Sequence, residues 1–410
     1  MQNIKSIIFG FIALTVSSSI QAQSSANSPY TRYGYGILAD GSFGPARAMG
    51  GTSLGFRQNN RINSANPASY SAIDSTTFLF DFGLSGQIGK FAEGNARETK
   101  QNGGIDYLAI QFPLWKNVGA SIGLVPFSTV GYQFGDSLAL NTTSGTKTYS
   151  GEGGFSQVYG GIAWAPFKNL SVGANFNYLF GSISHEKATT LGTGVYSGSE
   201  TIRLRSRALK TDFGVQYFTT GKEKNFCIGA TYSPKTKISA TVDTIKIQSN
   251  SSSTTAKTTG IDFDIADSYG LGAAIQLNNN WTIASDALYQ NWSKANYYSK
   301  KDTLNDRFRI SGGVEYIPNS NGRKYYERIK YRLGAHVSNN YLNIRNQSLG
   351  EYGVSLGLGL PFKTSRSVLN LGVEYTKINP QNSLMIKESY LKFSVNITFN
   401  EFWFFKRKID

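Results

Sequence analysis

The sequence predicts an all-β protein: an antiparallel transmembrane β-barrel of about 14 strands with an N-terminal plug. Three observations predict this fold. Apolar and polar residues alternate through most of the chain after Phe78, no apolar run is long enough for a membrane-spanning helix, and the connections between strands alternate between short and long. Alternation of this kind places successive side chains on opposite faces of a strand.

The composition supports a folded chain with many turns. With 13% aromatic and 16% charged residues and 44 Gly, the 410-residue chain does not have the composition of a disordered, collagen-like or coiled-coil protein. Its mean hydropathy is −0.28, and a transmembrane helix needs about 20 consecutive apolar residues, which the chain lacks. A barrel remains compatible, because its lumen-facing residues keep the average hydropathy low.

Residues 1–22 are predicted to be a cleavable signal peptide. Lys5 precedes the apolar stretch from Ile7 to Val16, and Ala22 stands before Gln23. A chain outside the cytoplasm does not meet nucleic acid, so we attribute the net charge of +15 to the anionic sugar lipids of a bacterial surface. The expected location is the outer membrane of a Gram-negative bacterium.

Residues 23–77 lack the barrel pattern and form the predicted plug. They are rich in Gly, Ser and Asn, and they carry aromatic residues, among them Tyr33 and Tyr35. The alternative is a flexible periplasmic tail. The aromatic content favours a plug folded into the lumen, because a solvated tail has no use for aromatic side chains.

Residues 78–410 are predicted to form the barrel. The clearest strand has the apolar side chains Leu391, Phe393, Val395, Ile397 and Phe399 on one face and polar residues on the other. Division at Gly, Pro, Asn and charge clusters predicts fourteen strands, at 78–89, 104–115, 117–127, 154–166, 170–184, 200–218, 224–238, 260–277, 281–292, 305–317, 328–338, 347–361, 368–378 and 386–400.

The connections separate into two classes. Those at 90–103, 128–153, 185–199, 239–259 and 293–304 are long, and the others are tight except 317–328. Long external loops opposite short periplasmic turns are typical of outer-membrane barrels. The alternative is a soluble β-sandwich, which needs polar outer faces that these strands lack. Trp164 and Trp281 lie near strand ends, where membrane interfaces favour such rings.

Several motifs resemble the FadL family of outer-membrane long-chain fatty-acid and hydrocarbon transporters. Ala48-Met49-Gly50-Gly51-Thr52, followed by Asn66-Pro67-Ala68-Ser69-Tyr70, is similar to the N-terminal hatch of that family. Ser285 to Ser293, with its Trp292-Ser293 pair, looks like one of its strands. The resemblance covers plug and barrel and implies passive uptake of long-chain fatty acids or other hydrophobic molecules. The short segment between hatch and barrel and the Phe402-Trp403-Phe404-Phe405 tail depart from the family pattern.

An apolar external segment is the first candidate ligand site. The side chains Phe127, Val130, Tyr132, Phe134, Leu138 and Leu140 are more apolar than a solvated loop requires. They are predicted to form a surface groove for an acyl chain. The alternative is that they cover the barrel mouth or belong to the upper ends of strands.

Charged residues in the inward phase are the second candidate. Arg309, Lys330 and Arg332 lie on lumen-facing positions, together with acidic residues on neighbouring strands. A guanidinium can hold the carboxylate of a fatty acid with two hydrogen bonds. The alternative is that these charges pair with each other and stiffen a polar lumen.

Arg203, Arg205 and Arg207 alternate along the outer end of the predicted sixth strand, in phase with its lipid-facing residues. This spacing predicts contact with lipopolysaccharide phosphates, and a solvated extension of the strand is the alternative.

Enzymatic signals are weak. The only histidines, His185 and His336, form no metal-ligand or Ser-His pattern, and a single cysteine, Cys227, forms no internal disulfide. We therefore expect no enzyme, no metal and no cofactor, and we expect a monomer. Two other functions stay open: a scaffold that binds secreted or surface proteins, and a general porin, which the predicted plug disfavours.

Overall fold

The computed structural model describes residues 27–139, 144–191, 197–221, 224–248, 251–278, 280–344, 347–363, 365–380 and 385–403. The predicted signal peptide, Leu140 and the residues after Trp403 lie outside these ranges. None of the helices in the described ranges is long and apolar enough to cross a membrane.

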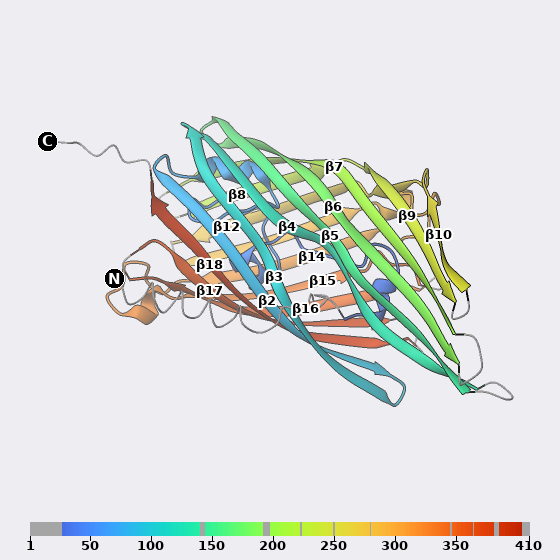
Figure 1. Ribbon diagram of the computed structural model, residues 1–410. Coiled ribbons are helices and arrows are strands. Elements are labelled where there is room, and N and C mark those ends of the chain that lie inside the picture. Colours follow the sequence, from blue (N-terminus) through green and yellow to red (C-terminus); the bar gives the residue numbers. More distant parts are fainter. Residues whose placement is uncertain are drawn as a thin grey trace.

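The wall of the molecule is a closed ring of antiparallel strands (Figure 1). The strands are β2 (Thr77–Glu93), β3 (Ala96–Trp115), β4 (Val118–Ala139), β5 (Ser144–Phe167), β6 (Leu170–Leu191), β7 (Gly198–Thr220), β8 (Lys224–Ser233), β9 (Thr236–Gln248), β10 (Ser251–Thr258), β11 (Phe263–Ile265), β12 (Ser268–Leu277), β13 (Trp281–Gln290), β14 (Arg307–Tyr316), β15 (Lys330–Asn339), β16 (Leu349–Pro361), β17 (Val368–Pro380) and β18 (Lys387–Phe402). The last strand, β18, pairs with β2 from Lys387 to Phe402 and closes the ring.

The ring has fourteen wall positions, as the sequence predicts. Strands β8 and β9 follow one another along one position, since both pair with β7. Strands β10, β11 and β12 share the next position, where β11 pairs with β9 and β12 with β8. The long connection between β14 and β15 contains the 3-10 helix η4 (Tyr325–Arg328) and removes no strand from the count.

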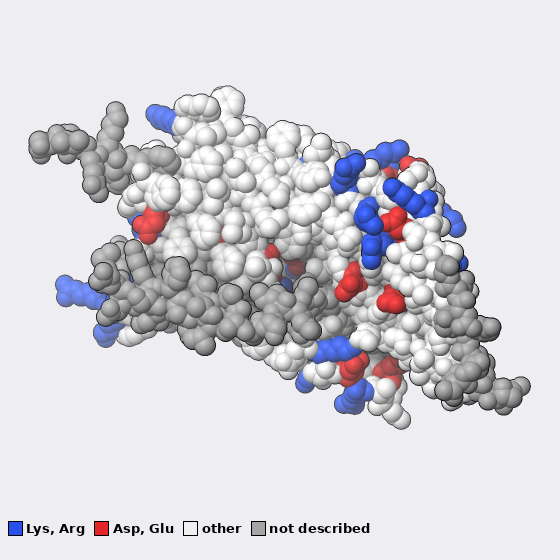
Figure 2. All heavy atoms as spheres, viewed as in Figure 1, with Lys and Arg blue, Asp and Glu red and all other residues white. Residues whose placement is uncertain are grey.

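The predicted alternation is confirmed. On β18 the polar Asn396, Thr398 and Asn400 are buried, whereas Phe393 and Val395 are exposed on the outside. Figure 2 shows a broad band of the outer surface without charged residues, with lysine and arginine gathered beyond it. A soluble sandwich is excluded, because the large apolar side chains lie on the outside of a closed ring.

Four tryptophans mark one edge of this band. Trp115, Trp164, Trp281 and Trp403 are 71%, 55%, 45% and 66% exposed, and each lies at or near a strand end on the side of the short turns. Tryptophan favours the interface between hydrocarbon and water. The short turns therefore mark the periplasmic end of the barrel, since outer-membrane barrels carry their short turns there.

Four of the predicted long external loops are largely strand. The β2–β3 connection is reduced to residues 94–95, the segment 128–153 is mainly the β4–β5 hairpin, and 185–199 and 239–259 also contain extended strand. These extensions stand beyond the hydrocarbon, so both of their faces accept polar residues and the apolar alternation disappears. In these extensions the backbone hydrogen bonds between strands continue although the side chains no longer alternate. The connection 293–304 is a loop, as predicted, and begins with η3 (Trp292–Lys294).

The N-terminal segment, defined here as residues 27–76, contacts the inner face of the wall. It contains η1 (Pro29–Arg32), β1 (Ile37–Leu38), α2 (Gly44–Arg47) and η2 (Pro67–Ala72). Figure 1 shows it in blue among the strands. Its side chains and backbone meet residues of widely separated strands of the ring, among them β3, β6, β14 and β15.

Candidate functional site

Glycines on the inner wall let the N-terminal segment approach the strands closely. A Cβ on Gly334 of β15 would overlap the backbone of Met49 and Gly50, and one on Gly313 of β14 would lie 2.5 Å from the carbonyl oxygen of Met49. On β6, a Cβ on Gly173 would lie 2.6 Å from the carbonyl carbon of Pro67. The segment is therefore held backbone to backbone against widely separated strands.

The Asn-Pro-Ala motif forms a helix start. The Asn66 side chain accepts a hydrogen bond from the backbone N–H of Ala68 at 3.2 Å and donates to the carbonyl of Leu54 at 2.8 Å. Pro67 occupies the first position of η2, where its missing N–H costs nothing. Both residues are buried. The motif thus ties two turns of the N-terminal segment to each other.

Buried ion pairs join the N-terminal segment to the wall. Arg47 of α2 pairs with Asp106 of β3. Arg61 lies 3.4 Å from the Glu315 carboxylate on β14, which also accepts from Arg332 at 2.6 Å. Removal of one partner from such a buried pair typically costs about 3–5 kcal/mol, because an unpaired charge remains.

Asp40 joins the segment to two arginines of β14. Its carboxylate lies 2.8 Å from Arg309 and 3.5 Å from Arg307. Burial raises the pKa of Asp40, but the charges of Arg309 and Arg307 outweigh burial and hold that pKa below its ordinary value. Asp40 is therefore ionised at neutral pH.

The outer part of the lumen is filled by an aromatic cluster around Tyr35. The Tyr35 side chain is fully buried and packs against Trp292 at 5.8 Å and Tyr297 at 5.2 Å between ring centroids. The Tyr35 hydroxyl donates to the carbonyl of Asp264 at 3.1 Å, and the backbone N–H of Tyr35 donates to the Tyr341 hydroxyl at 2.9 Å. Tyr33, two residues earlier, is 44% exposed and lies outside this cluster.

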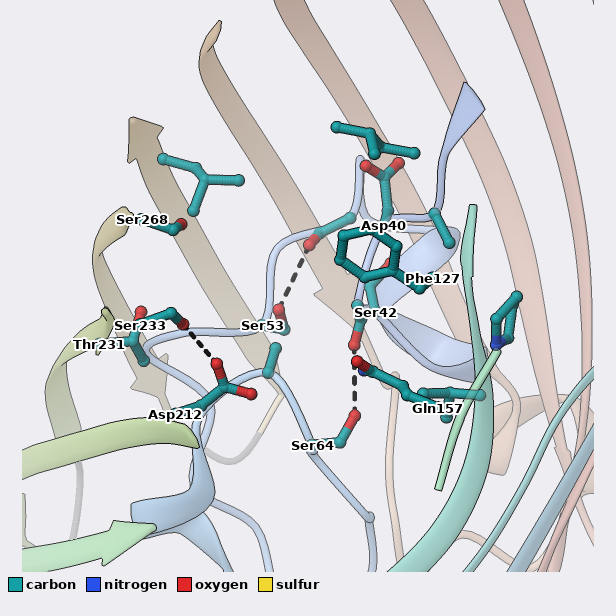
Figure 3. A pocket seen from close by; sticks show the side chains of 18 of the residues that line it. Asp40, Ser42, Ser53, Ser64, Phe127, Gln157, Asp212, Thr231, Ser233 and Ser268 are labelled. Atoms are coloured by element: carbon teal, nitrogen blue, oxygen red, sulfur yellow. Dashed lines mark hydrogen bonds between the residues drawn. The ribbon is translucent and has the colours of Figure 1, made fainter. Parts of the chain in front are cut away.

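Two cavities remain beside the N-terminal segment, of about 220 and 230 Å³. Both touch Leu38 and Asp40, so this short stretch separates them. Figure 3 shows the first cavity, with Ser53 of the N-terminal segment on one side and the hydrogen-bonded Asp212 and Ser233 on another. The walls combine hydroxyl and carboxylate groups with a few apolar side chains such as Phe127.

The second cavity reaches an opening in the side of the barrel. Strand β3 pairs with β2 from Ala96 onward but with β4 only from Leu108. The cavity is lined there by Gly103 and Gly104 of β3 and by Pro126 of β4. In Figure 2 the surface is hollowed in this region, and charged side chains are visible at the bottom of the hollow.

Two bulges explain why β3 and β4 separate. Asp106 is an extra residue on β3, because Leu84 pairs with Ile105 and Gly83 with Tyr107. Phe127 is an extra residue on β4, since Pro126 and Ser128 pair with consecutive residues of β5. A bulge bends its strand and increases its twist. Beyond the bulges, β1 takes the place beside β4 and pairs with Ser128 and Thr129.

The described side chains of the predicted surface groove, from Phe127 to Phe134, belong to β4, and Val130 and Tyr132 turn inward instead of forming a groove on the surface. Val130 and Tyr132 are buried in the aromatic cluster, and Phe134 packs against that cluster. Phe127 lines the first cavity. Leu138 pairs with Gly145 in the β4–β5 hairpin, so its backbone is strand rather than loop.

The predicted inward charges do face the lumen, and two of the three are already paired. Arg309 holds Asp40, and Arg332 holds Glu315 and donates to Asn370 at 2.8 Å. Lys330 forms no ion pair with the described residues. Arg205 is on the outside, 2.9 Å from Asp243, while Arg203 donates to Ser184 at 3.3 Å and Arg207 is exposed.

Sequence reasoning missed Asp40, Asp106 and the wall glycines. Asp40 is the one acidic residue between Tyr35 and Tyr70, and Arg309 is in the inward phase. The Asp40–Arg309 pair could have been predicted by seeking an acidic partner for each lumen-facing arginine. The wall glycines carried no signal of their own, because the chain contains many glycines and their role depends on the backbone opposite.

Comparison with known proteins identifies the family. The model of the BamG family matches residues 3–410. The chain belongs to the BamG family. No curated protein matches this BamG-family chain in sequence.

Solved structures share the fold of this family member at low sequence identity. The Pseudomonas putida toluene transporter TodX has 17% identity and a TM-score of 0.61, covering 90% of this chain and 100% of its own. The CymD monoaromatic hydrocarbon channel has 14% identity and a TM-score of 0.58, with the same coverage. A Pseudomonas aeruginosa FadL homologue has 11% identity and a TM-score of 0.60, covering 89% of this chain and 99% of its own.

These likenesses confirm the FadL resemblance at the level of the fold, whereas the matching family carries a different name. They show that the chain has the fold of an outer-membrane β-barrel. CymD is a channel and TodX a transporter.

Proposed function

We propose that the barrel takes up hydrophobic small molecules passively and that the side opening between β3 and β4 is part of the route. The observation that carries the proposal is the cavity of about 230 Å³, which is lined by Gly103 and Gly104 on the part of β3 that does not pair with β4, by Pro126 of β4 and by the N-terminal segment. A molecule in the cavity meets the N-terminal segment, which acts as the plug. TodX is a toluene transporter and CymD a monoaromatic hydrocarbon channel.

The cavity volumes favour a compact molecule over a long acyl chain. An apolar cavity of about 150 Å³ binds benzene, so each cavity here has room for one monoaromatic ring. A long-chain fatty acid needs both cavities, which requires movement of Leu38, Ala39 and Asp40. Of the three predicted carboxylate partners only Arg309 lines one of these cavities, and it is engaged with Asp40; Lys330 and Arg332 line neither cavity.

A glycine in the opening permits a direct test. A Cβ on Gly104 meets no atom within 4 Å, so the side chain of Gly104→Trp starts in open space beside the opening. We expect this variant to reduce protein-dependent uptake of radiolabelled toluene and oleate by about tenfold in cells that lack the native protein. The matched control is Gly160→Trp on β5, where a Cβ also meets no atom within 4 Å and the neighbouring Tyr159 faces inward. Equal uptake by the two variants, or no uptake that depends on the protein, contradicts the proposal.

A second candidate function is a scaffold for secreted or surface proteins. The observation that favours it is the closure of the lumen by the Tyr35 cluster and by the buried ion pairs, together with cavities whose walls are partly charged. Such a lumen suits a fixed barrel that binds partners with its ends. Chemical crosslinking of the protein in intact outer membranes, with identification of the crosslinked peptides, tests it: a partner crosslinked to the long β4–β5 or β6–β7 hairpins supports the scaffold.

The arginines on the outer face of β7 are still proposed to contact lipopolysaccharide. Arg205 and Arg207 are exposed on the outer face of β7, and their proposed partners are lipopolysaccharide phosphates. Arg205 also holds Asp243, so Arg207 is the residue with more capacity for a phosphate.

A further inference from the structure

The periplasmic end of the barrel contains a bowl of about 980 Å³. Its floor is the N-terminal segment around Arg57 and Asn60, and its rim includes Asn117 after β3, Thr219 at the end of β7, Ile317 after β14 and Lys363 after β16. Cavities of roughly 300–1,000 Å³ accommodate ligands of several residues or of drug size. This bowl is therefore much larger than a single phosphate or carboxylate requires.

The bowl is strongly basic. Four cations line it, namely Arg57, Arg328, Lys330 and Lys363, against one carboxylate, Glu315. Glu315 is already neutralised, because it accepts from Arg332 at 2.6 Å and lies 3.4 Å from Arg61. The nearby Asp74 is engaged too, by Asn59 at 2.9 Å and Arg366 at 3.9 Å.

None of the four cations has an ion pair with a described residue. The Arg57 guanidinium donates to the carbonyl of Ala68 and the hydroxyl of Ser71, and it stacks on Phe218 at 3.9 Å. Burial lowers the pKa of Arg57 to about 10, so it keeps its charge at neutral pH. Arg328 has only a ring contact with Tyr325 at 5.8 Å, and its Nε atom is buried without a hydrogen-bond partner.

We propose that this bowl binds an acidic segment of a periplasmic protein. Unpaired cations at this density attract anions and bind them with charge-assisted hydrogen bonds. A lipid headgroup does not fit the position, since the strands and turns stand between the bowl and the bilayer. The amides of Gln58, Asn60 and Asn225 add donors and acceptors for a peptide backbone.

The inference goes beyond uptake and is tested separately from it. Full-length protein in detergent micelles is titrated against a fluorescein-labelled octaglutamate peptide at low ionic strength, and binding is read as fluorescence anisotropy. We expect Arg328→Gln with Lys363→Gln to weaken binding by about tenfold, which corresponds to about 1.4 kcal/mol. The control is Lys116→Gln with Lys168→Gln, two exposed lysines in turns at the same end that do not line the bowl. This control variant removes the same amount of charge, and we expect its affinity for the peptide to change by less than about twofold.

Three results overturn the inference: no binding of the peptide, equal losses in the two double variants, or complete competition by inorganic phosphate or by anionic lipid at equal charge concentration. The first two mean that the bowl does not recognise the peptide, and the third assigns it to a small anion or a lipid. Circular dichroism of both variants verifies that the barrel is folded. The toluene and oleate assay is independent, because it reports on the side opening.

Discussion

At the scale of single residues, the fit between the N-terminal segment and the wall depends on missing side chains. Gly334 on β15 faces the backbone of Met49 and Gly50 so closely that any Cβ there overlaps it. Backbone atoms cannot rotate away as a side chain can. The close approach therefore makes glycine necessary at this position for steric reasons.

We predict that Gly334→Ala destabilises the protein by about 1–3 kcal/mol, the usual cost of overpacking. Gly312→Ala on β14 is the control, since a Cβ there lies 3.9 Å from the nearest atom, an ordinary contact. Guanidinium unfolding of the refolded protein, followed by tryptophan fluorescence, measures both. A Gly334→Ala variant as stable as Gly312→Ala would show that the segment moves aside at little cost.

The Asp40–Arg309 pair gives a prediction on pH. Because the folded pKa of Asp40 lies below its ordinary value of about 3.9, the pair stabilises the segment fully above about pH 4 and loses this contribution as the pH falls through the folded pKa. Hydrogen exchange of residues 37–43 measures it. We expect Asp40→Asn to be less protected than the native protein at pH 7 and the difference to shrink near pH 3. A constant difference at both values contradicts the assignment.

At the scale of elements, β1 replaces β3 as the neighbour of β4 beyond the bulges. Its pairing with Ser128 and Thr129 is extended by a hydrogen bond from the N–H of Ala39 to the carbonyl of Phe127 at 2.9 Å. This contact joins the plug to the wall at the side opening. A change in β1 therefore acts on both the lumen and the opening.

We predict that Ala39→Pro, which removes this N–H, loosens the plug and raises ion conductance in planar bilayers severalfold over the native protein. Ala39→Ser is the control, because it retains the amide donor. If both variants conduct like the native protein, the hydrogen bond does not hold the plug in place.

At the scale of the whole molecule, the sequence determined the number of strands, their order and their outward faces, because each wall strand must present apolar residues to lipid at every second position. The stretch from Leu391 to Phe399 illustrates this. The hairpin ends were missed, since Arg97 to Gln101 on β3 stand in water and need no apolar face.

The site was predicted less well than the wall. The inward positions of Arg309 and Arg332 followed from alternation, but their partners Asp40 and Glu315 depended on where the plug and the neighbouring strands meet them. The direction of Val130 and Tyr132 depended on the bulge at Phe127, which shifts the alternation by one residue and has no signature in sequence alone. Long-range register, rather than local propensity, decides these positions.

The pairing of β18 with β2 has a consequence for biogenesis. The N-terminal segment directly precedes β2, so it emerges before the wall strands during translation, yet it lies within a ring that is sealed only when β18 pairs with β2. Because the backbone of the segment lies close against strands on opposing sides of the ring, we infer that the segment is enclosed before the seam closes. The species that inserts into the membrane is therefore a partly closed sheet that already surrounds residues 27–76.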